Sequence, residues 1–67
     1  MSAVEAQIHL SELLVERALA SIEGLATDSA YMTDLDEEIA ATRHAYIAAA
    51  IAEIATLRAE LSAPQIG

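Results

Sequence analysis

Six alanines in the second half of the chain recur at alternating steps of four and three residues. Because an α-helix turns once in about 3.6 residues, this spacing places all six on one side of a helix. Such a surface presents only methyl groups, so the backbone of a neighbouring helix can approach closely. This alanine seam consists of Ala41, Ala45, Ala48, Ala52, Ala55 and Ala59. The spacing therefore predicts a helix that packs against another helix.

Two long segments without glycine or proline predict two helices. Ser2 and Glu5 have the spacing of a capping box, in which each side chain accepts from the other residue's backbone N–H. Gly24 is suited to a left-handed turn that ends the first helix, and Pro64 is suited to ending the second. We predict a single helical-hairpin domain over residues 1–67: a helix at about 2–24, a connection at 25–33, a helix at 34–62 and a short C-terminal tail.

The stretch before the second helix has two interpretations. It is a loop, or Asp28 caps one extra turn that carries Tyr31 and Met32. In either case Thr33 or Asp34 then caps the second helix, which places three acids in its first turn, where the helix dipole favours negative charge. The three acids are Asp36, Glu37 and Glu38.

Both predicted helices have more apolar surface than one neighbour can cover. In the first helix a narrow apolar arc is made by Val4, Ile8, Val15, Leu19 and Ile22, and it is extended by Leu10, Leu14, Ala18 and Leu25. The second helix has, besides the alanine seam, a bulky face made by Leu35, Ile39, Tyr46, Ile47, Ile51, Ile54, Leu57 and Leu61. The short connection favours antiparallel neighbours. These patterns predict an all-α antiparallel helical hairpin that dimerises into a four-helix bundle.

Two arrangements satisfy this prediction. In the preferred one, the bulky face packs on the first helix of the same chain, and the alanine seam is the oligomer interface, where it meets its own copy near Ala48 and Ala52. In the other, the seam receives Leu10, Leu13 and Leu14, and the bulky face forms the dimer interface.

The charge balance excludes several classes of function. Eleven acidic residues stand against three arginines and no lysine, which gives a net charge of −8. Binding to nucleic acid or to an anionic membrane requires clustered cations, so we expect neither partner. The chain has no cysteine and therefore neither a disulfide nor a thiolate zinc site. A basic, apolar leader is absent from the N-terminus, so we expect a cytoplasmic protein.

Three groups of polar residues are candidates for chemistry. His9 shares a helical face with Glu5, Glu12 and Glu16, but the order and the polar surroundings favour a solvated face over a metal site. Arg43 projects into the bulky face, where it either extends outward to solvent or needs a carboxylate partner. Asp36 is the nearest carboxylate in the chain, and an acid of a neighbouring chain is the other candidate. The serines have no histidine and acid arranged around them. We therefore expect no enzyme, no cofactor and no bound metal.

The function that these patterns favour is that of a non-enzymatic, homo-oligomerising protein–protein interaction module. An alternative is a small acidic inhibitor or nucleic-acid mimic, similar in size and charge to phage-encoded proteins that act against the host or its defences. It would block a basic groove on a partner protein. Its acidic surface would consist of Asp34, Asp36, Glu37, Glu38, Glu12 and Glu16. A further alternative is a metal-binding bundle that uses His9 and His44 with glutamates.

Overall fold

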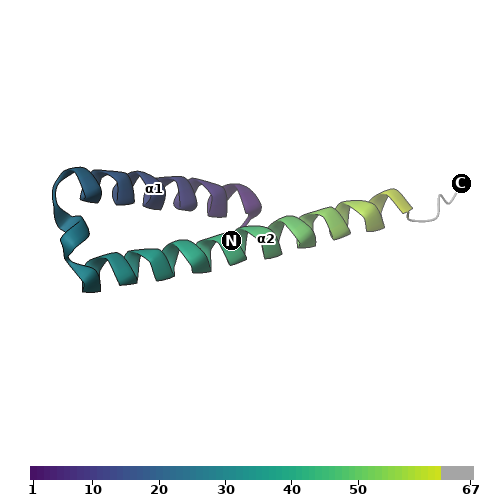
Figure 1. The fold of residues 1–67 in the computed structure, drawn as a ribbon. Helices are drawn as coiled ribbons and strands as arrows, with labels where there is room; N and C mark the ends of the chain where they lie inside the picture. Colours follow the sequence, from purple (N-terminus) through teal and green to yellow (C-terminus); the bar gives the residue numbers. More distant parts are fainter. Residues whose placement is uncertain (63–67) are drawn as a thin grey trace, which may run out of the picture.

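The chain folds into two antiparallel helices joined by a short turn (Figure 1). In this computed structural model, which describes residues 1–62, helix α1 spans Ala3–Ile22, the 3-10 turn η1 spans Leu25–Thr27 and helix α2 spans Ser29–Ser62. The predicted all-α helical hairpin is confirmed. The predicted stop at Pro64 lies outside the described residues.

A capping box and a left-handed glycine explain the two ends of α1. The Glu5 backbone N–H donates to Ser2 Oγ at 3.1 Å, and the Ser2 backbone N–H donates to Glu5 Oε1 at 3.0 Å, so the predicted capping box is present. At the other end, Gly24 has φ +84°, a left-handed conformation that side chains with a Cβ rarely adopt. The chain reverses direction here, as the sequence predicts.

Helix α2 begins five residues earlier than residue 34, the start we predicted. The Asp28 carboxylate accepts from the Tyr31 backbone N–H at 3.1 Å, and the Asp28 carbonyl accepts from the Met32 N–H at 3.0 Å. Asp28 is therefore the cap, and the helix continues without a break through Thr33 and Asp34. The cap at Thr33 or Asp34 was wrong because nothing between Ser29 and Asp34 interrupts a helix once Asp28 has started it.

A narrow line of side chains forms the contact between α1 and α2. On α1 the buried residues recur every seven positions, and on α2 they follow steps of four and three, which is the spacing of a coiled-coil seam. They are Ala6, Leu13 and Ala20 on α1, and Leu35, Ile39 and Thr42 on α2. Leu10 and Tyr31, both half-buried, pack against the cluster of Leu13, Leu35 and Ile39.

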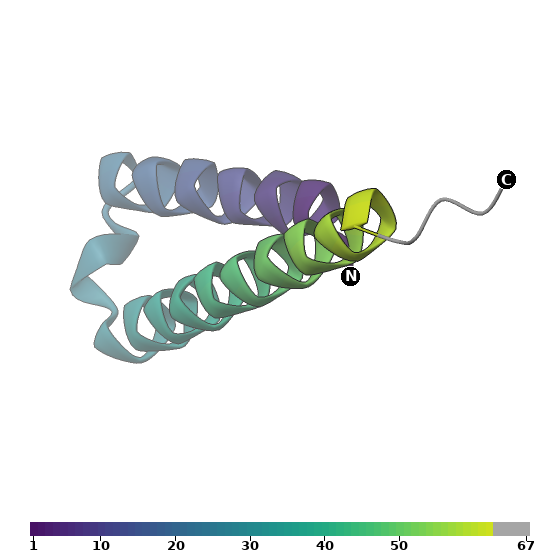
Figure 2. The same ribbon diagram turned by 90° about the vertical axis from the view of Figure 1, so that its right-hand side faces the viewer.

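The bulky face of α2 does not pack on α1 as a unit, and the preferred arrangement from the sequence is wrong in this respect. Leu35 and Ile39 are buried and Tyr46 is half-buried, but the large side chains from Ile47 onward are exposed. One reason is the direction of the contact line, which follows residues 35, 39, 42 and 46. The other is length, because α2 has 34 residues and α1 only 20. The backbone N–H of Ala3, the first residue of α1, donates to Glu53 Oε2 at 2.9 Å, and α2 continues beyond that level (Figures 1 and 2).

Candidate functional site

Most of the large apolar side chains of this protein lie outside its core. Five apolar residues within residues 1–62 are buried, whereas thirteen large ones are exposed, with 41 to 80% of their surface accessible. A folded soluble chain rarely leaves large contiguous apolar patches in water unless they bind something. The exposed apolar residues are therefore the candidate functional site.

The first part of this site is a stripe along α1 on the side away from α2. Val15 lies two positions from the buried Leu13, and residues two apart on a helix point about 200° apart. The same relation connects Val4 with Ala6 and Ile22 with Ala20. We call Val4, Ile8, Val15, Leu19 and Ile22 the α1 outer stripe; their exposed fractions are 65, 55, 58, 51 and 80%. It coincides with the apolar arc that the sequence predicts for the first helix.

The second part is a stripe along α2 that extends past the end of α1. Its members follow steps of four, four, three, four and three residues, which keeps them on one side of the helix. We call Arg43, Ile47, Ile51, Ile54, Arg58 and Leu61 the α2 outer stripe. All six are exposed. Within residues 1–62 no ion pair involves Arg43 or Arg58.

Each outer stripe contains a shallow groove. On α1 it measures about 350 Å³ and is lined by Val4, Gln7, Ile8, Ser11 and Glu12. On α2 it measures about 390 Å³ and is lined by Ile51, Ile54, Ala55 and Arg58. Both grooves are open to solvent and mostly apolar, so they suit the side-chain ridges of another helix rather than an enclosed small molecule.

The alanine seam also remains uncovered within the hairpin. Ala45 is half-buried, and the other five members are exposed. The second arrangement from the sequence required the seam to receive Leu10, Leu13 and Leu14 of the same chain. The seam does not contact them in this way, so that arrangement is wrong. The seam's role as an oligomer interface stays a prediction.

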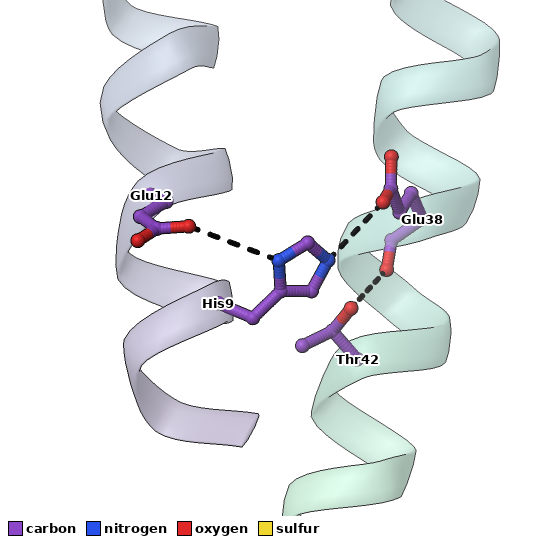
Figure 3. Close-up of polar contacts among 4 residues, drawn as sticks. All are labelled: His9, Glu12, Glu38 and Thr42. Carbon is purple, nitrogen blue, oxygen red and sulfur yellow. Dashed lines mark hydrogen bonds and ion pairs between the residues drawn. The ribbon is translucent and has the colours of Figure 1, made fainter. Parts of the chain in front are cut away.

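The polar candidates lie around His9, on a different side of α1 from its outer stripe. His9 Nε2 lies 3.1 Å from Glu38 Oε1 on α2, and His9 Nδ1 lies 4.0 Å from Glu12 Oε2 (Figure 3). The Thr42 hydroxyl donates to the Glu38 carbonyl at 2.8 Å, so the hydroxyl of this buried side chain has a partner. The histidine thus connects the two helices.

The structure does not bring the two histidines together. His44 is exposed and lies two positions from the buried Thr42, so it points away from α1 and from His9. No group of three or more histidine, cysteine or acidic side chains placed to hold a metal ion occurs in residues 1–62.

The six residues of the predicted acidic surface separate into two groups. Asp36 accepts from Arg17 Nε at 2.7 Å, and Glu38 and Glu12 lie near His9, so these three take part in contacts of the hairpin itself. All six are exposed. Of the other three, Glu16 lies close enough to Tyr31 on α2 to raise the pKa of its phenol, whereas Asp34 and Glu37 make no ion pair within residues 1–62. Asp36, the intrachain candidate for Arg43, is instead bound by Arg17 from α1.

Tyr31 and Arg17 have altered acid–base properties for identifiable reasons. Loss of solvent around Tyr31 raises the pKa of its phenol, and the negative charge of Glu16 raises it further. The bond to Asp36 raises the pKa of the Arg17 guanidinium, and the attraction between the two charges adds to this effect. Neither shift creates a group that titrates near neutral pH, so neither suggests an acid or a base for catalysis.

Comparison of the chain with protein-family models, with curated protein sequences and with solved structures gives no match. Across residues 1–62, neither helix combines the length and the apolar character that crossing a membrane requires. Any functional conclusion for this chain therefore depends on the two outer stripes and on the polar contacts described above.

Proposed function

We propose that this protein is a non-enzymatic, self-associating helical module whose hairpins assemble with further copies of the same chain into a helical bundle. The observation that carries the proposal is the exposure of the α1 and α2 outer stripes. Five large aliphatic residues of the α1 outer stripe and four of the α2 outer stripe remain more than half exposed in a single copy. A second copy is the occupant that is always present at a matching concentration.

Energetics favour assembly over a stable single hairpin. Burying a large aliphatic side chain stabilises the folded state by about 1.5–3 kcal/mol. A single hairpin gains little of this stabilisation, because most of its large aliphatic side chains are exposed. Domains of about 60 residues bury only about 60% of the surface of their unfolded chain and are marginally stable. Folding that is coupled to association adds the missing burial, so stability should depend on protein concentration.

Sedimentation velocity and light scattering over a hundredfold range of concentration test this proposal. We expect a mass above that of one 7.1 kDa chain and a melting temperature that rises with concentration. A protein that stays at the mass of one chain and melts at the same temperature throughout would refute self-association. The acidic-inhibitor alternative requires capture of a protein with a basic surface, and such capture should weaken as salt is added.

A further inference from the structure

We propose that the α2 outer stripe of one copy docks on the α1 outer stripe of a second copy, so that copies join head to tail. This inference rests on the proposed self-association and specifies its interface. It requires that the α2 outer stripe binds the α1 outer stripe of a second copy more tightly than either stripe binds the same stripe of that copy. Charge and length both support this requirement.

The charges of the two stripes are complementary. Arg17 is bound to Asp36, and the other two arginines of the chain, Arg43 and Arg58, are both members of the α2 outer stripe. Pairing two α2 outer stripes would bring only cations together. The α1 outer stripe is bordered by acids, and one of them, Glu12, lines its groove beside Val4 and Ile8. The bordering acids are Glu5, Glu12, Glu16 and Glu23.

The two stripes also agree in length. From Val4 to Ile22 and from Arg43 to Leu61 each stripe covers 18 residue steps (22 − 4 and 61 − 43). Aligned antiparallel from end to end, they place Arg58 opposite Gln7, between Glu5 and Glu12, and Arg43 opposite Ile22, next to Glu23. Ile51 then lies opposite Leu14 and Ile47 opposite Ala18, and each arginine has a carboxylate of the second copy within reach of its long side chain.

The position of the stripes determines the type of assembly. The α1 outer stripe lies on the side of α1 opposite its contact with α2. The α2 outer stripe is turned by only about 100° from the contact line of α2, because Ile47 of the stripe directly follows Tyr46 of the contact line. The two stripes therefore face different directions, and one neighbour covers only one of them. Each copy contributes two different surfaces, which gives a heterologous interface that either closes into a ring or continues as a filament.

Two blocked variants test this pairing. Ile8→Glu with Val15→Glu blocks the α1 outer stripe, and Ile51→Glu with Ile54→Glu blocks the α2 outer stripe. All four side chains are more than half exposed in the hairpin, so circular dichroism should still report the helices. A charge buried without a partner should weaken each variant's self-association by about a hundredfold or more. Mixed in equal amounts, the two variants should form a heterodimer, because the first keeps an intact α2 outer stripe and the second an intact α1 outer stripe. The heterodimer should not grow further, since both of its remaining stripes are blocked.

Sedimentation of each variant alone and of the mixture distinguishes the possibilities. A variant that still associates alone through its remaining stripe, or through the alanine seam, overturns head-to-tail pairing, and so does a mixture that stays monomeric. A wild-type protein that is itself monomeric refutes the proposed function instead. Should a blocked variant lose its helices, the single variants Arg58→Glu and Glu12→Arg replace the pair. We expect their mixture to associate more tightly than either variant alone, and equal association would overturn the pairing.

Discussion

The Nε–H of Arg17 on α1 donates to Asp36 Oδ1 on α2 at 2.7 Å, and this bond links the two helices beside their core. It also separates the functions of the three arginines. Arg17 belongs to the hairpin, whereas Arg43 and Arg58 lie on the α2 outer stripe. Asp36, which the sequence offers as a partner for Arg43 on the same helix, is thereby bound by the other helix.

The bond between Arg17 and Asp36 should contribute modestly to stability and should be sensitive to salt. The two side chains are 45 and 53% exposed, so solvent screens their attraction. A double-mutant cycle with Arg17→Ala and Asp36→Ala should give a small favourable coupling that disappears near 1 M salt, where the screening length is about 3 Å. A coupling that does not change with salt would show that shape rather than charge holds this contact.

Leu13→Ala should destabilise the hairpin by about 2–5 kcal/mol, because it opens a cavity among Leu13, Leu35 and Ile39. Leu14→Ala is the matched control, since Leu14 is the same residue type one position away and is 41% exposed, against 6% for Leu13. Denaturant unfolding at one fixed protein concentration measures both changes. Equal decreases in the free energy of unfolding for the two variants would contradict the burial of Leu13 between the helices.

Gly24→Ala should destabilise the turn by about 1–2 kcal/mol through backbone strain alone. The left-handed φ of +84° is unfavourable for alanine, although a Cβ at this position would meet no other atom within 4 Å. Gly24→Asn should cost less, because asparagine tolerates this conformation better. Thermal melts of the three proteins provide the comparison. If alanine and asparagine are tolerated equally well, the turn has another conformation in solution.

The capping box should make α1 less stable in acid. The bonds with Ser2, first from its backbone N–H and then from its hydroxyl, lower the pKa of Glu5 below its ordinary 4.5. A carboxyl whose pKa is lower in the folded state stabilises the fold above the unfolded-state pKa. That contribution is lost as the pH falls through the folded-state value.

Glu5→Gln should therefore remove part of the loss of helicity between neutral pH and the acidic range below 4.5. Circular dichroism followed along an acid titration measures this. Glu37→Gln, at an exposed acid of α2, is the control and should leave the acid response of the wild type unchanged. An identical titration for Glu5→Gln and the wild type would show that the box does not form in solution.

Ala48→Leu with Ala52→Leu should leave self-association intact if the outer stripes provide the interface. The seam offers only methyl groups, whereas the outer stripes offer isoleucine and leucine, which bury several times more apolar area. Sedimentation at matched concentrations measures the outcome. Loss of assembly with unchanged helicity would instead assign the interface to the alanine seam, as the sequence suggested.

The secondary structure was largely predictable because its signals are local. Ser2 with Glu5, and Gly24, act through hydrogen bonds and backbone angles within a few residues, and the structure has both features as predicted. The start of α2 was missed because Asp28, Thr33 and Asp34 are all competent caps. Choosing among them depends on whether the turn from Ser29 to Met32 is helical, which residue types alone do not decide.

What the sequence alone determined is two helices, a tight reversal and more apolar surface than two helices can bury in each other. Which apolar residues meet was decided only by the tertiary structure. Ala6 and Ala20 lie in the contact on either side of Leu13, while Val4 and Ile22 stay outside. Both helices are apolar over a wide arc, so several contact lines satisfy the same pattern. The contact line that the fold adopts determines which apolar residues stay exposed and can contact a second copy.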